Sequence, residues 1–440
     1  MQIRKLLIAA VLLVALSGAV WYARRHPESS ETSKAAAASP TLVNVPETAA
    51  QTIDIKKKDG STVALARQSG KWAITAPAAY AADQDAANSL VSSLGPATAD
   101  SVVEEKPSDL GKYGLNTPSL TVTVHQKDGK SNEILFGDDV PAGSLVYARV
   151  NGDPKVYAVS SSVKTSLDKS VNDLRDKRLL TFDTNQLTRI DLASAKSDIE
   201  FGKNGQNDWA IVKPQPYRAD NFQVEELLRK LTDAKMDLSS SAEDTKKTDA
   251  SFASAKPLAT AKLTDLSGTQ SLEVRQNKDD YYAKSTAVAG TFKISSDLGK
   301  ELEKPLDDFR NKKIFDFGFN DPTKLEIQQG SSDKTFVRSG SDWKFNGKVM
   351  DAGSVQSLID KLRDLSAGKF ATTGFTTVAD TVTVVSNDGK RTEKAEFAKI
   401  PEGYMARRVN EPALYQLDAK AVNDILEASA NVKPAASAKK

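Results

Sequence analysis

The chain has 440 residues, too many for one typical domain core, and its 60 Lys and Arg residues nearly balance its 58 Asp and Glu residues. Because charges of both signs are interspersed along the chain, the composition argues against nucleic acid as a partner. Cysteine is absent, which excludes disulfides, thiol catalysis, cysteine metal sites and a lipid-modified N-terminal cysteine.

The N-terminus carries an apolar run, Leu6–Ala23, that is broken only by Ser17 and Gly18 and has basic residues on both sides. As a helix this run would be roughly 27 Å long, close to the ~30 Å thickness of a bilayer core. Trp21 and Tyr22 stand at its end, where interfacial aromatic residues are common. We therefore expect residues 1–26 to form a single transmembrane anchor.

A cleaved signal peptide is the alternative, with Leu6–Leu16 as its apolar region and cleavage near Ser17-Gly18-Ala19. The anchor is favoured because the apolar run continues past that site, and both interpretations export the remainder of the chain. Residues 27–50 are rich in Ser, Thr, Ala and Pro and are predicted to form a flexible stalk. Residues 433–440 are predicted to be a disordered tail.

Three tryptophans mark an internal repeat. Trp72, Trp209 and Trp343 stand at nearly equal intervals along the chain. Each begins a short apolar segment that is followed by an Asp and then by a helical stripe. Self-similarity at a fixed period indicates copies of one structural unit. We expect three units of domain size, the last one shortened, at residues 51–184, 185–319 and 320–432.

The helix in each unit follows a fixed register. Apolar residues stand 4, 7, 8 and 11 positions after Asp83, Asp220 and Asp351, which is the spacing of one face of an amphipathic helix. Each Asp suits the N-cap position, where its carboxylate accepts a bond from a first-turn N–H group. Gln223, three positions after Asp220, completes the pattern of a capping box.

Short strands surround this helix. The turn Lys58-Asp59-Gly60 separates two apolar segments, which is typical of a hairpin, and Leu120–Val124 alternates apolar and polar residues. The predicted fold class is α+β. It consists of three tandem repeats of a mostly antiparallel sheet with one or two covering helices, preceded by a single transmembrane helix.

A basic motif closes the first two units. Arg175 lies in Asp173–Leu180 and Arg310 in Asp308–Phe315, whereas the third unit ends without such a motif. The motif is therefore interpreted as a connector between consecutive units. Arg175 and Arg310 are candidate contacts either with a partner protein or, as we favour, between one unit and the next through an ion pair or a helix C-terminal cap.

The residues of chemical interest are few. His26 abuts the anchor and His125 ends a strand, and neither has a nucleophile or an orienting partner in view. Asp138 and Asp139 form a weak carboxylate pair that is also typical of a turn. The three repeated tryptophans suit either a sugar-stacking platform or a core anchor, and repetition just before a helix favours the core. We predict no catalytic residue, no metal site and no cofactor.

Several segments resemble the bacterial domain-of-unknown-function family numbered 4340, DUF4340. They are Trp72-Ala73-Ile74, Ala82-Asp83, Leu110–Pro118, Leu135-Phe136-Gly137, Tyr147-Ala148-Arg149 and Leu174-Arg175-Asp176-Lys177. The resemblance is strongest over residues 50–183 and looser afterwards. It implies an anchored extracytoplasmic protein of the bacterial inner membrane, associated with auxiliary ABC transporter components of the gliding-motility type. It implies no activity.

These observations lead to three hypotheses of decreasing weight. The first is a non-enzymatic, membrane-anchored periplasmic scaffold or binding protein that works with an ABC transporter or an envelope protein. The second is a glycan-binding envelope module in which the repeated aromatic residues stack on sugars. The third is a hydrolase that uses loop carboxylates such as Asp138 and Asp139.

Overall fold

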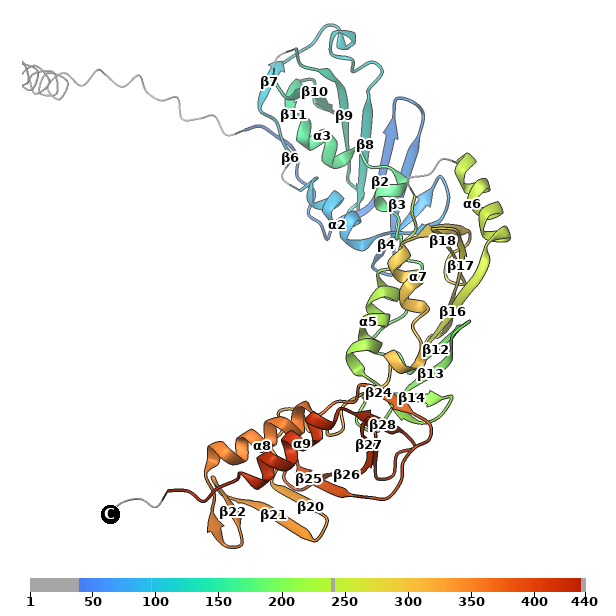
Figure 1. Cartoon of the computed structure of the whole chain (residues 1–440). Coiled ribbons are helices and arrows are strands. Elements are labelled where there is room, and N and C mark those ends of the chain that lie inside the picture. Colours follow the sequence, from blue (N-terminus) through green and yellow to red (C-terminus); the bar gives the residue numbers. More distant parts are fainter. Residues whose placement is uncertain (1–38, 96, 142, 239–241, 437–440) are drawn as a thin grey trace, which may run out of the picture. The chain divides into compact units, whose positions relative to one another are not determined.

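The computed structural model describes residues 39–436 apart from 96, 142 and 239–241 (Figure 1). The predicted anchor at residues 1–26 lies outside the described residues. Within the described ranges, no helix has the length and apolar character needed to cross a bilayer. The chain divides into two compact units, one ending at Asp176 and the next beginning at Lys177.

Three large sheets make up most of the chain, and every pairing between their strands is antiparallel. The first sheet belongs to the first compact unit, and the second and third sheets belong to the second. The expected α+β class, with several mostly antiparallel sheet units and few helices, is confirmed.

The first sheet has nine strands. In spatial order they are β5 (Tyr80–Ala81), β4 (Lys71–Ala76), β3 (Thr62–Gln68), β2 (Ala50–Lys57), β8 (Leu120–Gln126), β9 (Ser131–Asp139), β10 (Leu145–Val150), β11 (Val156–Ser160) and β7 (Ser101–Glu104). The chain thus runs outward from the centre of the sheet through β2 to β5 and then adds β7 at the opposite edge. It returns to the centre at β8 and runs outward to β11, which pairs with β7.

The third sheet repeats this order, and the second sheet repeats it without the last edge strand. The second contains β15 (Tyr217–Arg218), β14 (Trp209–Lys213), β13 (Asp198–Lys203), β12 (Arg189–Ser194), β16 (Lys256–Asp265), β17 (Gly268–Asn277), β18 (Asp280–Ser285) and β19 (Thr291–Ile294). The third contains β23 (Lys348–Val349), β22 (Asp342–Phe345), β21 (Ser332–Ser339), β20 (Lys324–Gln329), β25 (Asp380–Ser386), β26 (Arg391–Ile400), β27 (Gly403–Arg408), β28 (Leu414–Leu417) and β24 (Lys369–Ala371).

Helices cover one face of each sheet, and in the second sheet a further helix packs on the opposite face, where Phe252 and Tyr282 form a cluster separate from the main core. The helices after the three Asp residues are α2 (Gln84–Ser92), α5 (Asn221–Thr232) and α8 (Ala352–Asp364). The others are α3 (Ser161–Leu167), α4 (Val171–Leu174), α6 (Ala242–Ser254), α7 (Ser296–Leu302), α9 (Ala419–Ala430) and the 3-10 turns η1 (Leu110–Tyr113) and η2 (Leu306–Asp308). Figure 1 shows α8 and α9 side by side over the third sheet.

Each sheet has its own apolar core beneath these helices. Every second residue of the central strands points into the core and forms one side of it. In the first sheet, Ile53 and Ile55 of β2 and Val122 and Val124 of β8 are at most 1% exposed. The helices supply the other side of the core with the apolar residues that the sequence placed on one helix face, for example Val355, Leu358, Ile359 and Leu362 of α8.

Residues that were predicted to belong to the stalk extend the core of the first sheet. β1 (Thr41–Val43) pairs with β6 (Ala97–Thr98), and Leu42, Val43 and Val45 are buried. The prediction of a flexible stalk up to residue 50 is therefore wrong for residues 41–50. This short cluster of apolar side chains was enough to add a strand, although the surrounding composition is that of a linker.

The prediction of a disordered tail from residue 433 is wrong for residues 433–435. The amide of Asp351 donates to the carbonyl of Lys433 (2.8 Å), and the amide of Ala435 donates to the carbonyl of Val349 (3.0 Å). These bonds satisfy backbone groups at the edge of the third sheet, so residues 433–435 belong to the folded structure.

Candidate interaction site at the junction of two sheets

The three predicted cap residues all stand at helix N-termini. The Asp83 carboxylate accepts from the amides of Asp85 and Ala86, and that of Asp220 accepts from Phe222 and Gln223. Asp351 accepts from the amide of Ser354. In each case the carboxylate satisfies first-turn N–H groups that have no partner within the helix.

The capping box expected at Gln223 is not formed. The backbone N–H of Asp220, which Gln223 would have to reach, donates instead to the carbonyl of Phe309 at 2.8 Å. The Gln223 side chain accepts from Lys304 Nζ at 3.0 Å. A distant backbone carbonyl therefore replaces the local partner that the sequence pattern suggested.

The backbone amide of each cap Asp donates a hydrogen bond to the segment that ends or follows the last element of the same unit. Asp83, Asp220 and Asp351 donate to the carbonyls of Leu174, Phe309 and Lys433, each at 2.8 Å. We call Leu174–Asp176, Phe309–Asn311 and Lys433–Ala435 the outgoing segments. The same backbone bond thus closes all three sheets, and the last sheet uses the residues expected to be a tail.

A second backbone hydrogen bond recurs where the chain enters each sheet. The amides of Ala99, Met236 and Ala367, which share one sequence offset from their cap Asp, donate to the carbonyls of Pro40, Lys177 and Lys312 at 2.7–2.8 Å. Between the second and third sheets, outgoing Phe309–Asn311 leads directly into incoming Lys312–Ile314. This connector adds backbone pairing to both sheets, because it also forms bridges at Arg310 and Lys313.

The three repeated tryptophans are buried. Trp72, Trp209 and Trp343 are 2%, 5% and 7% exposed, and they belong to the first, second and third cores respectively. The strands of Trp72 and Trp209 are fixed by a residue that was not predicted from the sequence, the one that follows the cap. Gln84 accepts from the amide of Trp72, and Asn221 accepts from that of Trp209, both at 2.9 Å.

The two repeated arginines lie against aromatic rings. The guanidinium carbon of Arg175 is 4.3 Å from the ring centroid of Tyr80, within the same compact unit. That of Arg310 is 4.0 Å from the Tyr217 ring and 3.5 Å from the Phe370 ring. Since Tyr217 belongs to the second sheet and Phe370 to the third, Arg310 joins two sheets.

Arg310 is 7% exposed, and only part of its guanidinium group is paired with a carboxylate. Its Nη1 lies 2.9 Å from Asp307 Oδ1, while its Nε is buried with no hydrogen-bond partner among the described residues. Burial between two rings favours arginine over lysine, because the planar guanidinium stacks and is weakly hydrated.

A network of charged residues lies beside Arg310. We call it the junction network and define it as Arg218, Asp316, Glu393, Arg408, Glu411 and Tyr415. The Glu411 carboxylate bridges its two arginines, with Oε1 at 2.6 Å from Arg408 Nε and Oε2 at 3.2 Å from Arg218 Nε. Because Arg218 is in β15 and Arg408 is in β27, this single carboxylate ties the second sheet to the third.

The connector backbone is held by the same arginines. Arg218 donates to the carbonyl of Lys313 and Arg408 to that of Ile314. The amide of Asp316 donates to Glu393 Oε1 at 3.0 Å, and Arg408 Nη1 lies 3.0 Å from the same oxygen. Charge-assisted bonds of this kind are the stronger ones in proteins, so they fix the path of the connector.

Burial and charge act against each other within this network. Burial opposes ionisation of Arg218, but Tyr415 and Glu411 outweigh it, so its pKa is raised above the ordinary value. Burial, helped by Glu411 and opposed by Arg218, raises the pKa of Tyr415. Arg218 is thus kept as a cation and Tyr415 as a neutral hydroxyl, which are the forms the hydrogen bonds require.

A cleft of about 610 Å³ opens beside the junction network. One wall is the β13–β14 turn, Asn204–Asp208, with β14. The other wall is formed by two turns of the third sheet, at Asn387–Arg391 and at Asn410–Pro412. Arg218, Asn311 and Asp316 line it as well.

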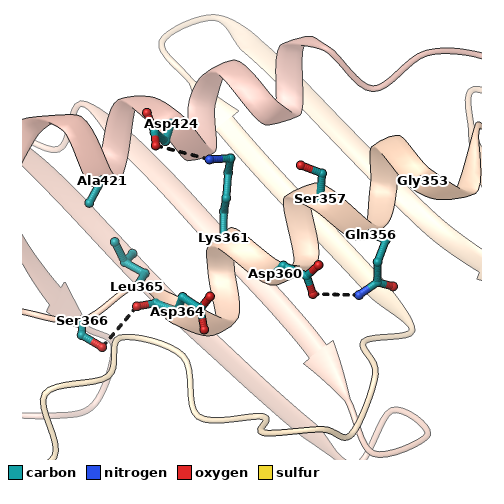
Figure 2. A pocket seen from close by; sticks show the side chains of 10 residues that line it. All are labelled: Gly353, Gln356, Ser357, Asp360, Lys361, Asp364, Leu365, Ser366, Ala421 and Asp424. Atoms are coloured by element: carbon teal, nitrogen blue, oxygen red, sulfur yellow. Dashed lines mark hydrogen bonds and ion pairs between the residues drawn. The ribbon is translucent and has the colours of Figure 1, made fainter. Parts of the chain in front are cut away.

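A groove of about 690 Å³ lies between α8 and α9 (Figure 2). Four of its polar side chains are paired with one another: Lys361 Nζ lies 3.3 Å from Asp424 Oδ2, and Gln356 donates to Asp360 Oδ1 at 2.9 Å. The groove therefore offers fewer unpaired polar groups to a ligand than the cleft beside the junction.

Three of the four remaining candidate residues lie on the surface of the first unit. Asp138 and Asp139 are exposed at the end of β9, and the Asp138 carboxylate packs over Gly114. His125 Nε2 lies 4.0 Å from Asp54 Oδ2 on the surface, whereas His26 lies outside the described residues. Across the described ranges, no group of three or more Asp, Glu or His residues could hold a metal ion.

The segments that resemble DUF4340 fit together in the first unit. Gly114 has a φ of +68° and ends η1, and a Cβ at Gly137 would stand 1.9 Å from the carbonyl oxygen of Tyr113. The motif Leu110–Pro118 therefore packs directly on the Phe136-Gly137 segment, and glycine at position 137 permits the close approach.

A model of the domain of unknown function DUF4340 matches residues 72–208 and 209–384. The chain belongs to the DUF4340 family. Each matched copy begins at a repeated tryptophan, so each one extends from the outer strands of one sheet into the first strands of the next. The resemblance seen in the sequence is thus confirmed for two adjacent copies.

Comparison with known proteins adds little beyond the family. No curated protein matches the chain. Two crystal structures of a DNA polymerase sliding clamp from Pseudomonas aeruginosa, one with a ligand, cover 86% of this chain and 93% of their own. Their sequence identities are 7% and 8% and their TM-scores are 0.16, values too low to support an argument from likeness.

Proposed function

We propose that this DUF4340 protein is a membrane-anchored, extracytoplasmic scaffold or binding subunit of an envelope complex, built from three tandem copies of one α+β unit. The observation that carries the proposal is the junction between the second and third sheets. There a shared connector, a stacked Arg310 and a bridging Glu411 join two cores. Such a construction suits a protein whose task is to hold surfaces at a fixed spacing.

The anchoring part of the proposal is supported by the sequence. The apolar run Leu6–Ala23 has the length of a bilayer span, and the strand β1 begins soon after it, at Thr41. A short tether of this kind would keep the first sheet close to the membrane surface. The inner membrane of a bacterium, with the sheets on the periplasmic side, is the location that the family resemblance favours.

The partner proposed is an ABC transporter or another envelope protein. The proposal involves no reaction, and the loop carboxylates Asp138 and Asp139 support a hydrolase poorly, because Asp138 packs against Gly114 at an exposed turn. Burial of the tryptophans likewise removes them as sugar-stacking platforms.

The test has two stages in cells that express the full chain. Membrane fractionation, with alkaline phosphatase fused after residue 436, measures anchoring and orientation. Cross-linking followed by purification from detergent-solubilised membranes then measures partners, with Arg310→Ala as a variant that disturbs the junction. Recovery of the full chain in the soluble fraction, or purification without any envelope protein, would overturn the proposal.

A further inference from the structure

The cleft between the β13–β14 turn and the two turns of the third sheet differs from the other hollows in its side chains. It has six amide side chains in its lining: Asn204, Gln206, Asn221, Asn311, Asn387 and Asn410. Each amide carries both hydrogen-bond donors and an acceptor. A cleft of about 610 Å³ also falls within the range of about 300–1,000 Å³ that is usual for sites of small ligands.

Several of these polar groups are available to a ligand. Within the ranges that the structure describes, the side chains of Gln206, Asp208, Asn387, Lys390 and Asn410 make no hydrogen bond or ion pair, and all five are exposed. They come from turns of two different sheets and face one cleft. The junction network fixes the relative positions of these turns, because Arg218 and Glu411 also line it.

The charges of the cleft cancel. Three cations and three anions line it: Lys390, Arg391, Arg218, Asp208, Asp316 and Glu411. An anionic or a cationic ligand would be attracted by three of these groups and repelled by the other three, so the cleft offers it no net electrostatic attraction. A neutral molecule that carries many groups able both to donate and to accept would pair best with amides, carboxylates and guanidinium groups together.

We infer that this cleft binds a short neutral saccharide. Hydroxyl groups both donate and accept, as the amides do, and they match a lining with no net charge. Trp209, Ala210 and Ile211 of β14 all line the cleft, but the Trp209 and Ile211 side chains are buried in the core, at 5% and 1% exposed, and only Ala210 is half-buried. Sugar recognition here therefore rests on the polar side chains of the turns, and Trp209 contributes only the small part of its ring that is exposed. It does not depend on the membrane anchor or on a transporter partner.

The test is calorimetric titration of the full chain, held in a detergent without a sugar headgroup. The probes are neutral tetrasaccharides of glucose, galactose, mannose and N-acetylglucosamine, and a sulfated tetrasaccharide serves as the charged comparison. We expect saturable binding of at least one neutral probe and weaker binding of the sulfated one. No saturable binding of any neutral probe, or binding of the sulfated probe alone, would overturn the inference.

Variants locate the site. The double variant Gln206→Ala/Asp208→Ala removes two cleft side chains that make no hydrogen bond or ion pair within the described residues. Ala210→Phe fills part of the cleft. Both are expected to raise the dissociation constant about tenfold or more. In the double variant two hydrogen bonds of about 1 kcal/mol each are lost, and in Ala210→Phe the added ring occupies the space of the ligand. The matched control is Gln328→Ala/Asp333→Ala, a facing pair of exposed residues on β20 and β21 outside the cleft.

Melting temperatures of all variants are measured to show that they are folded. Unchanged affinity in both cleft variants, or an equal loss in the control, would overturn the inference. Fractionation and partner purification of the cleft variants should match those of the unmodified protein. A failure of sugar binding therefore leaves the proposed scaffold role standing, and a failure of anchoring leaves the cleft result interpretable.

Discussion

Arg310 and Phe370 form the closest stack between a cation and a ring in the described structure, with the guanidinium carbon 3.5 Å from the ring centroid. Phe370 belongs to β24, the edge strand of the third sheet, whereas Arg310 ends the second. On its other side Arg310 meets Tyr217 at 4.0 Å. The residue that repeats in the sequence is therefore also a residue that couples two cores.

Arg310→Ala should destabilise the second and third sheets together. Loss of two desolvated ring contacts is expected to lower the free energy of unfolding by about 2 kcal/mol. Arg310→Lys should recover only part of it, because ammonium does not stack on two rings. Arg175→Ala, which removes contact with the single ring of Tyr80, is the matched comparison and should have about half the effect. Urea denaturation measures all three, and equal effects at both positions would contradict the junction role.

Arg408 tests the charged part of the junction. Its guanidinium pairs with Glu393, whose side chain is 3% exposed. Arg408→Met should lower the free energy of unfolding by roughly 3–5 kcal/mol, because it leaves a buried carboxylate without its main cation. The double variant Arg408→Met/Glu393→Gln should be more stable than the single one.

The exposed pair Lys420–Asp424 provides the control for Arg408. Lys420→Met should leave the denaturation midpoint unchanged, since solvent screens such pairs. A double variant at 408 and 393 that is less stable than Arg408→Met alone would show that Glu393 acts through contacts other than Arg408.

The sequence predicted the parts of this fold that depend on local pattern. Cap residues such as Asp220 and the apolar stripe of α5 are readable because a helix imposes a short period. Phe370 and Glu411 were not predicted, since their partners Arg310 and Arg218 are distant in the chain and no periodic pattern links them. The strand at Thr41–Val43 was hidden by the linker-like composition around it.

Gly137→Ala should destabilise the first unit strongly. A Cβ at this position would stand 1.9 Å from the backbone oxygen of Tyr113, which cannot rotate away as a side chain can. Displacing the backbone is expected to lower the free energy of unfolding by about 3 kcal/mol. Gly129→Ala is the control, because Gly129 has a φ of +83° but open space around it. It should lower the stability by only about 1 kcal/mol. Similar midpoints for both variants in thermal unfolding would contradict the close packing of the Leu110–Pro118 motif.

The cap residues allow a graded test. Asp83→Ala removes an acceptor used by two helix amides and should lower the free energy of unfolding by about 1 kcal/mol. Asp83→Asn keeps an acceptor and should have a smaller effect. The backbone bond from residue 83 to Leu174 is retained in both variants. A full loss of structure in Asp83→Ala would therefore show that the side chain does more than cap α2. Circular dichroism during urea titration distinguishes these outcomes.

Asp380 should make the stability of the second unit depend on pH. It is 3% exposed at the start of β25, and one of its carboxylate oxygens is buried with no hydrogen-bond partner in the part of the chain that the structure describes. Burial, opposed by Lys399, raises its pKa above 3.8. A raised pKa means that the folded state binds the proton more tightly than the unfolded chain does. The resulting stabilisation is full below pH 3.8 and is lost as the pH rises through the folded value.

Asp380→Asn cannot ionise and should therefore escape that loss. Relative to the unmodified protein, the variant is expected to gain stability as the pH rises from 3 toward 7 and to keep a constant advantage from 7 to 9. Denaturation midpoints measured at unit steps of pH give this difference directly. A difference that is flat from pH 3 to 7, or that falls with rising pH, would mean that the Asp380 carboxylate is ionised in the folded protein at no disadvantage, and that Lys399 compensates its burial in full.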